Sequence, residues 1–164
     1  MPLVRDGKLA EDGWQKVDPE ATSMPSGDRL LVTFDQWNEH KVELCKRGGV
    51  FGVRLSPDHG PEAIARDLVH FDLVALEFPA FTDGRAYSHA RLLRERYGFE
   101  GEIRAVGDVS LEQLLFMHRS GFDAFEIASD SAVEDWETAF ADIDVFYQPT
   151  ADGRETALQA RRRS

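Results

Sequence analysis

The chain has 164 residues, of which 42% are hydrophobic and 30% charged, and its formal net charge is −11. This length predicts one domain with a hydrophobic core of its own, because domains cluster at roughly 100–150 residues. The acidic balance argues against nucleic acid and anionic membranes as partners, since both bind basic surfaces. The N-terminal residues contain no apolar leader, and no segment approaches the ~20 apolar residues of a membrane span. We therefore expect a cytoplasmic protein.

Three regions follow one another along the chain. Residues 1–29 form a polar, turn-rich N-terminal arm, in which the stretch "DPEATSMPSGD" (18–28) reads as a loop, and Trp14 is expected to pin the arm to the body. Residues 30–149 are expected to form a single α/β domain, and residues 150–164 a flexible tail. The strand-like segments of the domain are 30–37, 50–56, 73–79, 102–108, 124–128 and 145–149. The helical patterns between them are 40–49, 61–71, 86–97, 110–121 and 131–143. This alternation predicts about six mostly parallel strands.

Four of the expected strands carry one charge near the middle, where buried parallel strands are normally apolar. These residues are Arg54, Glu77, Arg104 and Glu126, and their signs alternate in chain order. Buried charges persist mainly when they are paired. The alternation therefore favours strands that are neighbours in sequence order, as in part of a TIM-like barrel, over a flavodoxin-like order. The four charges are either a structural ion-pair network or a polar pocket, and the sequence leaves both interpretations open.

The stretch "FPAFTDGR" follows the third strand, at the edge where ligands bind in both barrels and open sheets. Thr82 or Asp83 is placed to cap the next helix, and Gly84 allows unusual backbone angles. The helix N-terminus and the Arg85 guanidinium would together suit sulfate, phosphate or a carboxylate. The alternative is a capped helix in which Arg85 pairs with Asp83 or Asp108.

Cofactor motifs are weak in this sequence. There is no Walker-type loop, no complete Gly-rich dinucleotide fingerprint and no His/Cys/Asp cluster with zinc spacing. Cys45 alone cannot hold an iron–sulfur cluster, which takes about four ligands, and we expect it to be a small core residue. His59 and His118 are weaker acid–base candidates. We therefore expect no cofactor and no metal.

Two phrases, "FPAFTDGRAYSHARLLRERYGFEGEIRAVGDV" and "GFDAFEI", resemble a bacterial family known as domain of unknown function 934. The resemblance covers roughly residues 48–148. Members of that family carry the description of an oxidoreductase involved in sulfite reduction. The resemblance implies sulfite reductase or phosphoadenylyl-sulfate reductase as partners, and it implies no catalytic residues.

Two functions follow as hypotheses. The first is an accessory protein of assimilatory sulfate and sulfite reduction without a redox cofactor, acting through partner binding, an oxyanion pocket or both. The alternative is a small α/β enzyme on an anionic substrate, with Arg54, Arg85 and Arg104 as binders and Glu77 or Asp108 as the acid–base group. A set of six strands would also leave two open edges, which invite pairing or a covering element. We expect at least a homodimer, with the N-terminal arm around Trp14 as an alternative cover for one edge.

Overall fold

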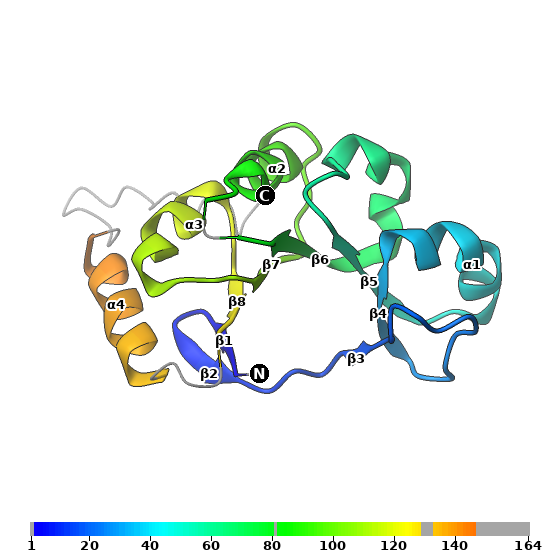
Figure 1. Cartoon of the computed structure of the whole chain (residues 1–164), viewed down its shortest axis with the longest axis horizontal. Helices are drawn as coiled ribbons and strands as arrows, with labels where there is room; N and C mark the ends of the chain where they lie inside the picture. The colour runs from blue at the N-terminus through cyan, green and yellow to red at the C-terminus, as the bar shows by residue number, and fades with distance from the viewer. Residues whose placement is uncertain (1, 81, 129–132, 147–164) are drawn as a thin grey trace.

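Eight strands form one curled sheet with the shape of a half-barrel in a computed structural model that describes residues 2–80, 82–128 and 133–146 (Figure 1). The strands are β1 (Leu3–Arg5), β2 (Lys8–Ala10), β3 (Gln15–Lys16), β4 (Arg29–Thr33), β5 (Val50–Leu55), β6 (Phe71–Phe78), β7 (Glu102–Gly107) and β8 (Ala124–Glu126). Their order across the sheet is β2-β1-β8-β7-β6-β5-β4-β3. From β4 to β8 every strand lies beside its sequence neighbour and pairs in parallel, which confirms the barrel-like order.

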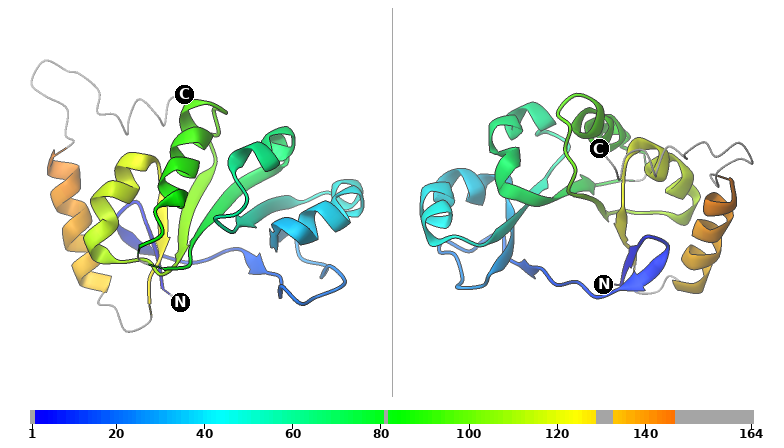
Figure 2. Two further views of the ribbon diagram at one scale, coloured as in Figure 1. Left: turned by 45° about the horizontal axis from the view of Figure 1, so that its top comes forward. Right: turned by 180° about the vertical axis from the view of Figure 1, so that it is seen from behind.

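Helices cover the outer side of this curled sheet (Figure 2). The α-helices are α1 (Phe34–Arg47), α2 (Arg85–Glu95), α3 (Leu114–Ser120) and α4 (Val133–Phe146), and short 3₁₀ helices occupy Pro61–Ala63, Ala65–His70 and Leu111–Gln113. The main core lies between these helices and the outer face of the sheet, and it includes Trp37, Phe78, Phe125 and Trp136. A smaller apolar cluster of Trp14, Leu31, Leu73, Ala75 and Val106 lies on the inner face.

The N-terminal arm supplies strands to both ends of the sheet, which the sequence did not indicate, whereas its residues 18–28 form no helix or strand, as expected of a loop. β1 pairs antiparallel with β8, and β2 pairs antiparallel with β1. The chain then crosses the open side of the half-barrel and adds β3 in parallel to β4 (Figure 1). Trp14 lies on this crossing and is buried, as expected. The sheet therefore has eight strands rather than six, and it includes two antiparallel pairs.

Two expected strands at other positions are wrong in part. The segment 30–37 ends as a strand at Thr33, because the Thr33 side chain accepts from the Gln36 amide and the Gln36 side chain accepts from the Thr33 amide. This capping box starts α1 at Phe34. At the other end of the domain, α4 continues to Phe146, which makes the start of the expected strand 145–149 helical. The rest of that strand and the tail at 150–164 lie outside the described residues.

Two smaller expectations also fail. Cys45 is exposed on α1 instead of buried in the core, because Trp37 and Leu44 provide the inward face of that helix. The segment 61–71 forms two 3₁₀ helices followed by the first residue of β6, rather than one α-helix.

Candidate functional site at the carboxyl ends of the strands

The four strand charges lie on the inner face of the half-barrel. Arg54 aligns with Ala75, Ala75 with Arg104 and Arg104 with Ala124 across β5 to β8. Aligned residues of neighbouring strands point to one face, and so do residues two positions apart on one strand. Glu77 and Glu126 therefore share the face of Arg54 and Arg104, as the strand pattern predicted.

This charge ladder is divided into two pairs. Arg54 Nη2 lies 3.2 Å from Glu77 Oε1, and Arg104 Nη1 lies 3.2 Å from Glu126 Oε1. Among the described residues no ion pair joins Glu77 to Arg104. The pairs also differ in exposure, because the Arg54 and Glu77 side chains are 40% and 30% exposed whereas those of Arg104 and Glu126 are 0% and 6% exposed.

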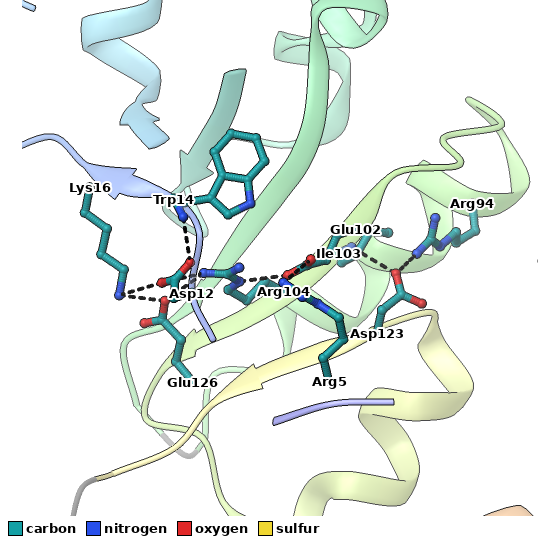
Figure 3. Close-up of polar contacts among 10 residues, drawn as sticks. All are labelled: Arg5, Asp12, Trp14, Lys16, Arg94, Glu102, Ile103, Arg104, Asp123 and Glu126. Carbon is teal, nitrogen blue, oxygen red and sulfur yellow. Dashed lines mark hydrogen bonds and ion pairs between the residues drawn. The ribbon is translucent and has the colours of Figure 1, made fainter. Parts of the chain in front are cut away.

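Arg104 is the centre of a buried charge cluster beneath the arm (Figure 3). Its guanidinium donates to Glu102 at 2.9 Å and to Asp12 of the arm at 3.1 Å, in addition to Glu126. Burial acts to lower the pKa of Arg104, but the carboxylates of Glu102, Asp12 and Glu126 outweigh it and raise the pKa above its ordinary value. A guanidinium held by three carboxylates and excluded from solvent has a structural role.

The Glu102 and Glu126 carboxylates of this cluster also bind cations of the arm. Arg5 of β1 contacts Glu102 at 2.9 Å, and Lys16 of β3 contacts Glu126 at 2.7 Å (Figure 3). The cluster thereby joins both ends of the arm to the inner face of β7 and β8. Of the two interpretations of the ladder, the structural one fits the Arg104 pair.

The Arg54 pair, in contrast, lies in an open cleft. A hollow of about 300 Å³ is lined by the ends of β4, β5 and β6 and by the start of α1, and it contains Arg54, Ser56, His59 and Glu77. A second hollow of about 280 Å³ lies between the arm and the inner face, and it shares Arg54 and Thr33 with the first. Ligand sites are typically clefts of about 300–1,000 Å³. The carboxyl ends of parallel strands are also where α/β proteins bind ligands.

His59 enters this cleft through a tight turn after β5. Its backbone amide donates to the Ser56 carbonyl at 3.0 Å, and its Nδ1 lies 3.1 Å from the Ser56 hydroxyl. The Phe34 ring lies 4.2 Å from the imidazole, centroid to centroid. The sequence marked His59 as a weak candidate only, because nothing in the local pattern shows that its turn lies beside Glu77. Asp35 and the arm residue Pro19, which also line this hollow, had no sequence signal.

Of the two alternatives for the "FTDGR" stretch, residues 82–85 match the one in which Arg85 pairs with Asp83. The Arg85 guanidinium pairs with Asp83 at 2.7 Å and with Asp58 at 3.0 Å. Hydrogen bonds from the side chain and backbone of Arg85 hold the pKa of Asp83 below its ordinary value. Two carboxylates thus occupy the guanidinium at the start of α2. Thr82 is exposed, and Gly84 has an ordinary φ of −93°, so its special conformational freedom is not used.

The structure therefore brings together only part of the predicted site set. Arg54 and Glu77 line the cleft, whereas Arg104 is enclosed beneath the arm and Thr82–Arg85 do not line either hollow. Asp108 follows β7, and its backbone amide donates to the Phe78 carbonyl at 2.7 Å. Asp58, a partner of Arg85, precedes His59 in the same turn but does not line either hollow.

Within residues 2–80, 82–128 and 133–146, no group of three or more His, Cys, Asp or Glu side chains is placed to hold a metal ion. In the same part of the chain, no helix is both long enough and apolar enough to span a bilayer.

The fold and the cleft define a class: an α/β half-barrel protein with an open polar site at the carboxyl ends of its parallel strands. The chain belongs to a family of bacterial proteins of unknown function, DUF934, whose model matches residues 52–158. The matched range begins within β5, includes β6 to β8 and contains the cleft residues Arg54 and Glu77. No curated protein and no solved structure matches the chain.

Proposed function

We propose that this protein binds a small anion in the cleft at the ends of β4, β5 and β6, with Arg54 as the anchor. The observation that supports this most is the position of Arg54, which lines both hollows and is 40% exposed. Within the described residues, its guanidinium has one ion-pair contact, to Glu77. An arginine offers five N–H donors in a planar fork, so an oxyanion can bind beside Glu77 or displace it.

The other two candidate arginines are less suited to this role. Arg104 is fully buried against three carboxylates, and Arg85 is held by Asp83 and Asp58. An incoming anion would have to break several charge-assisted hydrogen bonds at either residue. At Arg54 it competes with the partly exposed carboxylate of Glu77, the one ion-pair partner of this arginine among the described residues.

In the cell, we propose that the protein is a cytoplasmic accessory factor of sulfate and sulfite assimilation that has no redox cofactor of its own. The support is the resemblance to sulfite-associated proteins together with a cleft suited to a tetrahedral or pyramidal oxyanion. Sulfite reductase or phosphoadenylyl-sulfate reductase is the proposed partner, to which the protein would deliver or from which it would receive the anion.

Anion titration tests the binding proposal directly. Sulfate, sulfite and phosphate are titrated by calorimetry into the wild type, Arg54→Gln and Arg85→Gln. We expect Arg54→Gln to abolish binding and Arg85→Gln to retain it. A bound anion should also stabilise the folded state, by about 2.7 kcal/mol at a hundred times its dissociation constant. Binding that is lost in Arg85→Gln but retained in Arg54→Gln would place the site at the "FTDGR" loop instead.

A growth experiment tests the cellular role. A deletion strain is grown with sulfate, sulfite or cysteine as the sulfur source and complemented with the wild type or Arg54→Gln. We expect slow growth on sulfate and sulfite, normal growth on cysteine, and rescue by the wild type only. Normal growth of the deletion strain on all three sources would contradict the assignment to sulfur assimilation.

A second candidate function is an acid–base enzyme acting on an anionic substrate. The observation that favours it is the location of Glu77 and His59 in the same hollow as Arg54. Arg54 would hold the anionic group while Glu77 or His59 moves a proton. Asp108, the other acid–base candidate, does not line this hollow. Deuterium exchange from solvent into a bound organic anion, present in the wild type and absent in Glu77→Gln, would support this function.

A further inference from the structure

The second hollow, here called the arm chamber, is the space between arm residues 16–19 and the inner face of the sheet. Its volume is about 280 Å³, which exceeds the apolar cavity of about 150 Å³ that accommodates benzene in an engineered protein. Pro19, Thr33 and Arg54 line the chamber as well as the outer hollow, so the two spaces are neighbours.

The lining of the arm chamber is partly apolar and partly polar. Pro19 of the arm, Leu31 of β4 and Val106 of β7 contribute carbon, and Lys16, Asp18, Thr33 and Glu126 contribute polar groups. The opposite charges Lys16 and Glu126 are paired with each other at 2.7 Å. A molecule inside the chamber would therefore meet apolar surface from Pro19, Leu31 and Val106.

Hydrogen bonds and an ion pair hold the arm residues that form one wall of the chamber. The Val17 amide donates to the Leu31 carbonyl at 3.0 Å, and the Gln36 side chain donates to the Asp18 carbonyl at 2.7 Å. Lys16 adds its ion pair with Glu126. The chamber is thus largely preformed, as ligand sites usually are.

We infer that the natural ligand is a small organic anion, whose acidic group binds at Arg54 and whose apolar body of a few carbons occupies the arm chamber. This inference rests on the proposed anion site at Arg54 and adds the substrate class to it. An inorganic anion would fill only the polar end of the two neighbouring spaces. A short alkyl group in the chamber would gain the free energy of removing apolar surface from water.

A homologous series of alkylsulfonates, from methanesulfonate to butanesulfonate, tests the inference with the head group held constant. Each buried methylene contributes about 0.8 kcal/mol, so the dissociation constant should fall about fourfold for each carbon added. If methanesulfonate binds through Arg54 and the longer members bind no better, this inference is wrong while the proposed function stands. If no sulfonate and no inorganic anion binds, both are wrong.

Two Val→Phe variants assign the chain-length effect to the chamber. Val106→Phe would fill it, so this variant should lose the gain with chain length. Val69→Phe is the matched control, because Val69 is 84% exposed and does not line the chamber, and it should keep the full series. If Val106→Phe does not fold, Val106→Leu is tested in its place, and the wild-type series by itself still decides the outcome. A chain-length effect that persists unchanged in folded Val106→Phe or Val106→Leu would place the alkyl group elsewhere.

Discussion

At the scale of single residues, the two arginine–glutamate pairs of the inner face should contribute very differently to stability. Arg104→Ala would leave three carboxylates around an emptied buried position, and breaking such a cluster typically costs about 3–5 kcal/mol. Arg54→Ala breaks a partly exposed pair, for which about 0–1 kcal/mol is typical. Urea unfolding of both variants measures the difference. Equal losses would mean that the Arg104 cluster is hydrated in solution.

His89 on α2 provides a pH-dependent test of burial. Desolvation lowers the pKa of His89 in the folded protein, although Glu62 acts in the opposite direction. Between the lowered folded pKa and the ordinary value of 6.5, the unfolded chain binds more protons than the folded one. Stability should therefore fall as the pH drops through this window. Unfolding at about pH 7.5 and about pH 5.5 should show a smaller difference for His89→Gln than for the wild type, and an unchanged difference would contradict the assignment to His89.

The sequence predicted the chemistry of individual residues better than their surroundings. Period-two alternation placed Arg54, Glu77, Arg104 and Glu126 on one face, because side-chain direction in a strand is a local property. Which pair is exposed depends on the arm, and the arm contacts Arg104 through Asp12, 92 residues away in the chain. No local pattern contains that contact.

At the scale of elements, the boundary between β4 and α1 should depend on a single hydroxyl. Thr33 caps α1 and also lines the cleft, so the cap positions the helix that forms one wall of the site. Thr33→Ala should reduce the free energy of unfolding by about 1 kcal/mol, as loss of an N-cap typically does. Thr33→Ser keeps the hydroxyl and should retain most of the stability. Equal losses in the two variants would show that the methyl group, rather than the cap, is responsible.

The type of each element was predicted correctly where the sequence has one clear periodicity. The prediction failed where the signals for a strand and a helix overlap. Residues 30–37 are apolar enough to continue a strand, yet Thr33 and Gln36 have capping-box spacing, and the hydrogen-bonded cap decides the boundary. In α4, Trp136, Phe140 and Ile143 are buried at helical spacing, and the helix continues past them to Phe146. Val145 and Phe146 are therefore helical, although both residue types favour strands.

At the scale of the whole molecule, the N-terminal arm changes the expected oligomeric state. The sequence indicated two open sheet edges and hence a homodimer, but β1 and β3 cover the edges of β8 and β4. The new edge strands, β2 and β3, have three and two residues, and short edge strands resist edge-to-edge pairing. A homodimer would therefore need another surface. We expect light scattering at a protein concentration of tens of micromolar (a choice of conditions) to give the mass of one chain. A stable dimer would show that such a surface exists.

The arm also joins the two ends of the half-barrel, and Trp14 should be the residue that holds its middle in place. Trp14 is 7% exposed, packs against Leu31 and Val106 and lies under the Arg29 guanidinium at 4.7 Å. Trp14→Ala should cost about 3–5 kcal/mol, as truncation of a buried aromatic residue typically does. Trp37→Ala is the matched control, because Trp37 is fully buried in the outer core and should cost a similar amount.

Hydrogen exchange should separate these two tryptophan variants. The Val17 amide donates to the Leu31 carbonyl at the β4 end of the arm, and the Ile127 amide donates to the Pro2 carbonyl at the β8 end. If Trp14 fastens the arm, both amides should exchange faster in Trp14→Ala than in Trp37→Ala at equal global stability, because the arm then opens without unfolding of the sheet. Equal exchange rates would mean that the ion pairs of Asp12 and Lys16 hold the arm without Trp14. Faster exchange at Val17 alone would show that the two ends of the arm open independently, and that only the arm-chamber end depends on the tryptophan.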